Sequence, residues 1–393
     1  MTLGILLIAT APWSAVERLA GAMADTGVAV DALYPSGHAL AHCRHVRRHF
    51  RYSGLAPLNC IRRAIAKSAP RLLIAGDDRA ASLLSALSCE ATHEEAALLD
   101  FSFGKPFLFQ RLGNRNFFIA ECARAGVRVA EMIAVPALDA FEPALARLGL
   151  PVAVKSDHSW GGEGVVIAHT REAARAAYLK LAATPTRLRA LARAARRRDP
   201  HFVTVPRTPS VGLQRFVAGA PATSSIACWR GELIAANHFD VVASQTPDGP
   251  ATVLARSVCP HMQEAARRIA RHFGLSGLHG LDYIRDPSGT VHLLEINPRA
   301  TPTHHLALAS DPCHALLAAA GIAAPPRPAV TAAHHIALFP QEWRRDPASR
   351  HLTAAFHDVP WDDPDMMEAL TGREFGLEPI LTMPASSSAA LPA

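Results

Sequence analysis

The sequence has little of several features that mark whole classes of protein. Of its 40 basic residues only four are lysines, and the aromatic content is 6%. The seven cysteines are scattered and form no Cys-x-x-Cys pair, which argues against a disulfide framework or a zinc ribbon and for a reducing cytoplasm. No run of about eighteen apolar residues occurs, so we expect no transmembrane helix and no membrane partner.

The N-terminal third also lacks a dinucleotide-binding fingerprint. Ala9-Thr10-Ala11-Pro12 follows the first apolar run, where a glycine-rich loop would stand. Short apolar strands alternate with helical patterns, which predicts a parallel, doubly wound sheet. The expected strands are residues 3–9, 28–34 and 71–75, and the expected helices are residues 15–25, 58–67 and 79–87. Gly76-Asp77-Asp78 then ends a strand at a position where such folds bind ligands, although a helix N-cap by Asp77 or Asp78 is favoured.

Residues 294–299, Leu-Glu-Ile-Asn-Pro-Arg, are the most informative segment. Alternate side chains of a strand share one face, so Glu295, Asn297 and Arg299 are expected to project together. Asp282 lies in the preceding apolar run, and the turn between the two runs predicts a hairpin that sets Asp282 opposite Glu295. These oxygen ligands suit Mg²⁺, with Mn²⁺ as a possible substitute, and the arginine suits phosphate. The alternative is that both acids face water at strand ends.

A lysine within an apolar strand is the second signal. Lys155 stands near the end of the strand predicted at residues 151–157. The loop that follows contains Gly161, Gly162, Glu163 and Gly164. A lysine ammonium suits phosphate oxygens, and glycines let backbone N–H groups approach them closely. The loop is not a Walker A sequence, and a plain hairpin with a glycine turn is the competing interpretation.

The order of these pieces resembles the ATP-grasp superfamily from about residue 113 to about residue 308. Gly113-Asn114-Arg115-Asn116 is similar to a segment in which the family often has Gly-Asp-Lys, so Arg115 would replace a phosphate-contacting lysine. Lys155 resembles the strand lysine that reaches the nucleotide phosphates, and residues 159–164 resemble the lid loop. Gln214-Arg215-Phe216-Val217 resembles the hinge strand whose backbone contacts adenine, with Gln214 where a glutamate is common.

The resemblance also implies roles and a reaction. Asp282, Glu295 and Asn297 would be the metal ligands, and Arg299 with Lys155 would steady the transferred phosphate. The implied cofactors are ATP and Mg²⁺. The implied enzyme is an ATP-dependent ligase that activates a small-molecule carboxylate as an acylphosphate for attack by an amine or another nucleophile. Two alternatives stay open: a small-molecule kinase that uses the same ATP site, and a catalytically silent nucleotide-binding regulator.

The expected fold class is α/β, in four parts. A Rossmann-like parallel-sheet domain at residues 1–112 precedes a two-subdomain α+β ATP-grasp module. The module divides into a small lid subdomain at residues 113–210 and a large subdomain with the metal site at residues 211–325. Residues 326–393 would form a small C-terminal appendage and a disordered tail.

An arginine-rich insertion occupies residues 184–210. The net charge of +6 permits nucleic-acid binding, but no aromatic residues that could stack bases are interleaved there, so a solvated helix face is favoured. The expected partners are therefore small carboxylate and amine substrates, with a homodimer as a further possibility. His304 or His305 could line the acceptor pocket, and Arg256 could bind a substrate carboxylate.

Overall fold

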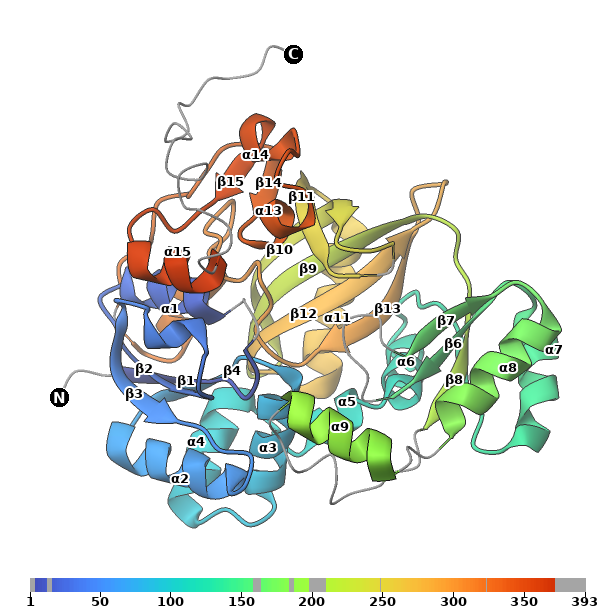
Figure 1. Ribbon diagram of the computed structural model, residues 1–393, viewed down its shortest axis with the longest axis horizontal. Coiled ribbons are helices and arrows are strands. Elements are labelled where there is room, and N and C mark those ends of the chain that lie inside the picture. The colour runs from blue at the N-terminus through green and yellow to red at the C-terminus, as the bar shows by residue number, and fades with distance from the viewer. Residues whose placement is uncertain are drawn as a thin grey trace.

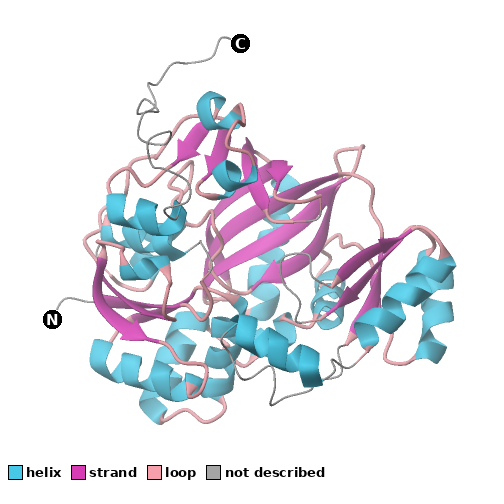
Figure 2. Ribbon diagram, viewed as in Figure 1, coloured by secondary structure: helices cyan, strands magenta, loops and turns pink. Residues whose placement is uncertain are grey.

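The computed structural model describes residues 4–12, 16–157, 164–183, 187–197, 210–247, 249–322 and 324–371. Within them the chain forms one seven-stranded and two four-stranded sheets, arranged side by side with helices packed on their faces (Figures 1 and 2). The predicted α/β class is therefore confirmed. None of the helices in these ranges has both the length and the apolar character needed to cross a bilayer.

The N-terminal domain is a parallel sheet in the order β3-β2-β1-β4. Its strands are β1 (Gly4–Ile8), β2 (Ala29–Tyr34), β3 (Val46–Arg51) and β4 (Leu72–Ala75). The helices that follow them are α1 (Val16–Ala24), η1 (Ala39–Ala41), α2 (Pro57–Ser68), α3 (Asp78–Ser88) and α4 (His93–Phe103). The strand β1 is buried along its whole length, as expected of an apolar run covered on both faces. The predicted parallel sheet is confirmed, with β3 as an additional edge strand.

A second, antiparallel sheet lies on the other side of the molecule, in the order β5-β8-β6-β7 (Figure 1). Its strands are β5 (Met132–Ala134), β6 (Val152–Ser156), β7 (Val165–Ala168) and β8 (Val211–Arg215). The helices in this part of the chain are α5 (Leu108–Leu112), α6 (Arg115–Arg124), η2 (Leu138–Ala140), α7 (Phe141–Leu148), α8 (Arg171–Ala182) and α9 (Arg187–Arg197), of which α7 and α8 share a core cluster with the small sheet. The small sheet thus continues to Arg215, beyond the boundary predicted after residue 210.

The large sheet runs β13-β12-β9-β10-β11-β14-β15. Its strands are β9 (Ala220–Trp229), β10 (Glu232–Ser244), β11 (Ala251–Ser257), β12 (Gly277–Arg285), β13 (Val291–Asn297), β14 (His335–Leu338) and β15 (Phe356–Asp358). Helix α11 (Pro260–Phe273) packs in the same core cluster as Ile226, whereas α12 (Pro312–Ala319) packs with Ala227. Because neighbouring strand residues point to opposite faces, the two helices cover opposite faces of the sheet.

The C-terminal segment extends the large sheet. Strand β14 pairs with β11 in the antiparallel sense, and β15 pairs with β14 in parallel. Three short helices accompany these strands: α13 (Gln341–Arg345), α14 (His351–Ala354) and α15 (Pro364–Thr371). The segment predicted as an appendage thus forms one edge of the central sheet, and the tail expected to be disordered lies beyond the described residues.

Candidate active site

The hairpin β12–β13 sets two carboxylates side by side. Asp282 pairs directly with Glu295, and Gly280 pairs with Asn297. Asp282 Oδ1 accepts a hydrogen bond from Thr223 Oγ1 at 2.9 Å, and its Oδ2 accepts one from Asn297 Nδ2 at 2.8 Å. The hairpin predicted from the sequence is therefore present. Asp282 and Glu295 lie side by side on its two strands.

The turn fixes the register that brings these acids together. Asp286 Oδ1 accepts hydrogen bonds from the backbone amides of Ser288 and Thr290 at 2.9 and 3.0 Å. Gly289 adopts a φ of 84°, a left-handed conformation that favours glycine. An aspartate that closes its own turn, followed by such a glycine, is a strong local signal for this geometry.

Arg115 connects the small sheet to the hairpin. Asn114 caps helix α6 by accepting from Phe117 N at 2.8 Å, which places Arg115 in the first turn. The Arg115 Nε lies 2.8 Å from Glu295 Oε2, and Nη1 donates to Ser156 O at 2.5 Å. The backbone amide of Arg115 also donates to Asp157 Oδ1 at 3.1 Å. The guanidinium thus bridges the end of β6 and the strand β13.

Lys155 lies on β6, next to this bridge. The residue is 7% exposed, and its backbone pairs with Val165 on one side and Gly212 on the other. Its positive charge acts on Glu295 and helps to lower the pKa of that carboxyl. The structure therefore brings together the lysine and the acids that the sequence predicted would meet.

Arg299 completes the group from the end of the 294–299 segment. Its Nη2 donates to Asn297 Oδ1 at 3.1 Å, and its Nε lies 3.1 Å from Asp78 Oδ2 in the first turn of α3. Asp77, in contrast, is the N-cap of α3 and binds Thr10. The favoured interpretation of a helix cap is confirmed for Asp77, whereas Asp78 contacts Arg299, a pairing that the sequence did not reveal.

The pKa values of the Asp282 and Glu295 carboxyls are shifted in opposite directions. Burial and then the charge of Glu295 raise the pKa of Asp282 to about 6. Burial also raises the pKa of Glu295, but Arg115, Lys155 and Arg299 outweigh it, and the net shift is downward. Burial and the neighbouring Glu295 thus disfavour the ionised form of Asp282, and a cation beside it would stabilise that form.

This donor set fits a hard divalent cation. It consists of two carboxylates and one carboxamide, and each of their oxygens has lone pairs beyond those used in the contacts above. Within the described ranges no three His, Cys, Asp or Glu side chains form a metal-binding group. Phosphate oxygens and water would have to supply the remaining ligands, which is usual for Mg²⁺.

The predicted hinge residues lie where the small sheet joins the large sheet. Strand β8 ends at Arg215 and β9 begins at Ala220, so Phe216 and Val217 lie in the connection. The Gln214 side chain is buried, and its Nε2 donates to Ala130 O at 3.1 Å. The Arg215 guanidinium binds Leu148 O at 3.0 Å and Glu131 Oε2 at 3.0 Å.

Other predicted residues lie elsewhere. Arg256 is on β11, separated from the hairpin by β10 and β9, and its Nη1 contacts Ala332 O. His304 is buried and binds Ile226 O and Thr301. Gly164 closes the glycine-rich loop, and its carbonyl accepts from Ser156 N at 2.9 Å. The remaining loop residues of that prediction, Gly161, Gly162 and Glu163, are outside the described part of the chain.

Sequence reasoning missed one further polar residue. Asn116 follows Arg115 in α6, and both polar atoms of its amide are buried without a hydrogen-bond partner among the residues that the structure describes. The amide lies against Gly212 so closely that a Cβ at Gly212 would come within 2.4 Å of Asn116 Oδ1. The glycine in β8 therefore makes room for Asn116, a signal visible only once the two elements are placed together.

Comparison with known proteins gives matches in structure alone. No family pattern and no curated protein sequence matches the chain. Carboxyaminoimidazole ribonucleotide synthase from Aspergillus clavatus, solved with ATP, superimposes with a TM-score of 0.59 at 13% identity, over 83% of this chain and 78% of that one. The biotin carboxylase domain of Hydrogenobacter thermophilus 2-oxoglutarate carboxylase, solved with MgADP and bicarbonate, gives 0.60 at 14% identity over 82% and 70%.

A third solved structure that resembles this chain is an amino acid ligase. The L-amino acid ligase from Bacillus licheniformis superimposes with a TM-score of 0.54 at 13% identity, over 81% of this chain and 74% of that one. All three are ATP-grasp ligases. They share with this chain the succession of a parallel N-terminal sheet and further sheets in an α/β arrangement. The chain therefore has the ATP-grasp fold.

Proposed function

We propose that the protein is an ATP-dependent ligase that converts a small-molecule carboxylate into an acylphosphate, which an amine or another nucleophile then attacks. One observation carries the proposal. Lys155, on the inner strand β6 of the small sheet, and Arg115, in the first turn of α6, both act on Glu295, which pairs with Asp282 in the large sheet. Such a junction of phosphate-binding cations with oxygen ligands for a metal is what nucleotide-dependent phosphoryl transfer requires.

Each side chain has a definite task in this proposal. Asp282, Glu295 and Asn297 would hold Mg²⁺, with Mn²⁺ as a substitute, and the metal would supply charge neutralisation at the phosphate oxygens. Lys155 and Arg115 would bind the phosphates of ATP, and the backbone beyond β8 would contact adenine. Holding both reactants in one geometry would then provide much of the rate enhancement.

Neighbouring side chains hold both arginines of the site in place. Arg115 forms an ion pair with Glu295, and Arg299 forms an ion pair with Asp78 and donates a hydrogen bond to Asn297. In our proposal, Arg299 turns from these acceptors to the phosphoryl group as negative charge develops on it. Because both guanidiniums are already ordered beside the site, little of the binding energy would be needed to bring them to the phosphates.

The substrate class is also part of this proposal. The neighbours in structure are solved in complex with different small molecules, bicarbonate in one and an aminoimidazole ribonucleotide in another, and a third is named an L-amino acid ligase. We infer a small carboxylate and an amine for this chain, without naming either. A homodimer remains a prediction, and the solved biotin carboxylase domain is itself a dimer.

The test is a paired screen of amino acids and small carboxylates for phosphate release with Mg-ATP. Lys155→Ala and Glu295→Gln should each lower turnover at least a hundredfold, as expected of groups that stabilise the transition state. Lys180→Ala and Glu264→Gln, which alter an exposed lysine and an exposed glutamate, are the matched controls and should leave turnover unchanged. Wild-type turnover in Glu295→Gln would disprove the metal assignment.

The same screen separates the alternatives. A phosphorylated product that forms without phosphate release when an amine is added identifies a kinase. ATP binding without turnover for every pair identifies a regulator. Ligation with one phosphate released for each product confirms the ligase.

A further inference from the structure

The small sheet has a hydrophobic core of its own, and it lies with α7 and α8 at one side of the molecule (Figure 1). The buried apolar side chains of this core, which include Phe141, Tyr178 and Leu213, come from residues 135–213. The two larger core clusters each combine the N-terminal domain with the large sheet, and among the described strands of the small sheet only Met132 joins them. A unit that packs mainly within itself can turn relative to the rest of the molecule.

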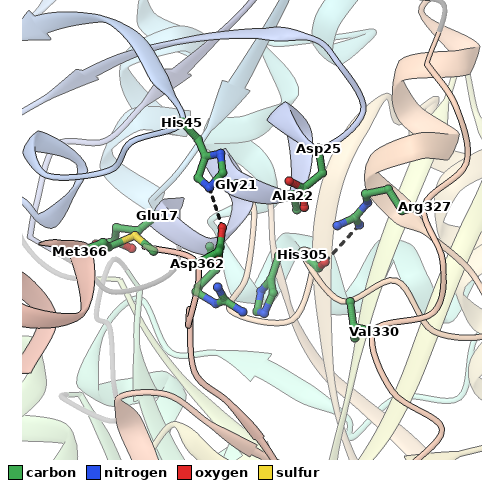
Figure 3. A pocket seen from close by; sticks show the side chains of 11 residues that line it. Glu17, Gly21, Ala22, Asp25, His45, His305, Arg327, Val330, Asp362 and Met366 are labelled. Carbon is green, nitrogen blue, oxygen red and sulfur yellow. Dashed lines mark hydrogen bonds and ion pairs between the residues drawn. The ribbon is translucent and has the colours of Figure 1, made fainter. Parts of the chain in front are cut away.

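The N-terminal domain, in contrast, is tied firmly to the large sheet. In addition to the shared core, Arg18 on α1 lies 2.7 Å from Asp358 on β15, and His45 lies 3.0 Å from Asp362. Figure 3 shows His45 and Asp362 beside a cavity that residues of both regions line. Core packing and ion pairs thus hold the N-terminal domain and the large sheet together as one body.

One end of the small sheet is joined to this body by backbone contacts. Leu293 of β13 donates its amide to Arg128 O at 3.0 Å and accepts from Ala130 N at 3.0 Å, just before β5. The chain also passes from the end of β8 at Arg215 into β9. Val152, the first residue of β6, pairs with Arg215, so β6 begins at this joint. A joint at one end permits rotation about that end, as in a hinged domain.

The other end of β6 is joined through a side chain. Ser156 lies four residues beyond Val152, which at about 3.3 Å for each residue places it about 13 Å farther from the hinge. Arg115 Nη1 donates to Ser156 O at 2.5 Å, and the Arg115 backbone amide donates to Asp157 Oδ1 at 3.1 Å. Arg115 Nε lies 2.8 Å from Glu295 Oε2. The small sheet is therefore attached to the large sheet at two separated points.

The chemistry of arginine suits this bridge. The guanidinium is planar and its donors diverge at fixed angles, so Nε and Nη1 hold acceptors on two different strands at once. A lysine presents a single nitrogen on a flexible stem and fixes neither direction. The Arg115 side chain is 14% exposed and Asp157 is 5% exposed, so these bonds form largely out of water, where they are stronger. The ATP-grasp superfamily often has a lysine here, so the bridge depends on a departure from that pattern.

We propose that Arg115 is a positioning residue, which holds the small sheet against β13 and so fixes the distance between Lys155 and Glu295. Lys155 precedes Ser156 on β6, and a rotation of the small sheet about the hinge would carry the lysine away from the carboxylates. This role is additional to the phosphate contact. It rests on the proposed function in that it concerns the assembly of the same site, but its test needs no turnover.

The test measures the distance between the small sheet and the large sheet in the full chain, by pulsed electron paramagnetic resonance without nucleotide or Mg²⁺. Spin labels are attached at Leu179→Cys on α8 and at Val258→Cys after β11, where the native side chains are 45% and 100% exposed. Cys89→Ser removes the exposed native cysteine, and the other six are buried. With Arg115 intact we expect one narrow distribution of distances, and a broad one would contradict the proposal.

Arg115→Lys keeps the positive charge and removes the fork. We expect its distance distribution to be at least twice as wide, or to show a second population, while its circular dichroism matches that of the parent protein. Arg147→Lys, which alters an exposed arginine paired with Glu131, is the matched control and should keep the narrow distribution. A distribution for Arg115→Lys as narrow as that of the control would overturn the proposal.

Asp157→Ala cuts the same attachment from the side of β6. It removes the acceptor of the Arg115 amide and should also widen the distribution, so it replaces Arg115→Lys if that variant does not fold. The outcomes are separable from those of the ligase screen. An inactive protein that still shows the widening refutes the ligase and leaves the positioning role, whereas an active protein without widening does the reverse.

Discussion

The Arg299 guanidinium is held by Asp78, with 3.1 Å between Arg299 Nε and Asp78 Oδ2. The two side chains are 13% and 23% exposed, respectively. Beside them, Ala300 N donates to Ala75 O at 2.9 Å, so a backbone bond joins the same two segments. The N-terminal domain therefore takes part in orienting an arginine that belongs to the candidate active site.

We expect Asp78→Asn to lower kcat about tenfold, equivalent to about 1.4 kcal/mol of transition-state stabilisation. The amide cannot carry the charge that holds Arg299, so the guanidinium would spend time in other orientations. Steady-state kinetics with ATP as the varied substrate measures the effect, and KM for ATP should change less than kcat. Asp240→Asn, which breaks an ion pair on β10, is the control, and equal losses in both variants would contradict the positioning role.

Asp282→Asn should weaken the apparent affinity for Mg²⁺ at least tenfold. The substitution removes a charged ligand yet keeps a similar shape, and Mg²⁺ binds through carboxylate oxygens. Turnover is measured against Mg²⁺ at fixed ATP, and chelation with EDTA should abolish turnover in both proteins. An unchanged Mg²⁺ dependence in Asp282→Asn would place the metal elsewhere.

Gln214→Glu should destabilise the protein, although glutamate is common at this place in the family that the sequence resembles. Gln214 Nε2 donates to Ala130 O at 3.1 Å and approaches Leu294 O at 3.5 Å. A carboxylate has no donor for these carbonyls, so we expect the free energy of unfolding to fall by about 1–3 kcal/mol. Urea denaturation measures the change. The exposed Gln245→Glu is the control and should stay within about 0.5 kcal/mol of the wild type.

Asp358 should make stability depend on pH in the acid range. Its pKa falls from the ordinary 3.8 to about 2 in the folded protein because Arg18 and His305 outweigh the effect of burial. The resulting stabilisation is fully present above pH 4 and is lost as pH falls through about 2. Its size is about 2 kcal/mol, from about 1.4 kcal/mol for each pKa unit. Asp358→Asn should flatten this part of the curve in acid titrations, and an unchanged slope would refute the assignment.

The sequence predicts those parts of the site whose determinants are local. Asp282 and Glu295 lie on adjacent strands joined by a short turn, so alternation and turn chemistry suffice to pair them. Lys155 is predicted because a charge within an apolar strand demands a partner. The contact between Asp78 and Arg299 escapes prediction because the two residues lie far apart in the sequence, and because the neighbouring Asp77 already explains the acidic pair as a helix cap.

The edges of the sheets escape prediction for a different reason. Strand β3 reads Val-Arg-Arg-His-Phe-Arg and is largely exposed, so it lacks the apolar pattern of its buried neighbours. Strands β14 and β15 are short, and each carries a histidine. The pairing of β14 with β11, and of β15 with β14, depends on contacts made across the fold. The buried strands are thus visible in the sequence, and the edge strands are defined only by their neighbours.

The pairing of β14 with β11 limits how far the chain can be shortened. Without residues 326–371, β11 would present a row of unpaired amide and carbonyl groups to solvent, and such a surface recruits strands of other molecules. The same truncation would remove the apolar side chains of Ile336 and Leu338, which pack against Leu254. A protease cut before β14 should therefore yield an aggregating fragment and not a smaller folded protein.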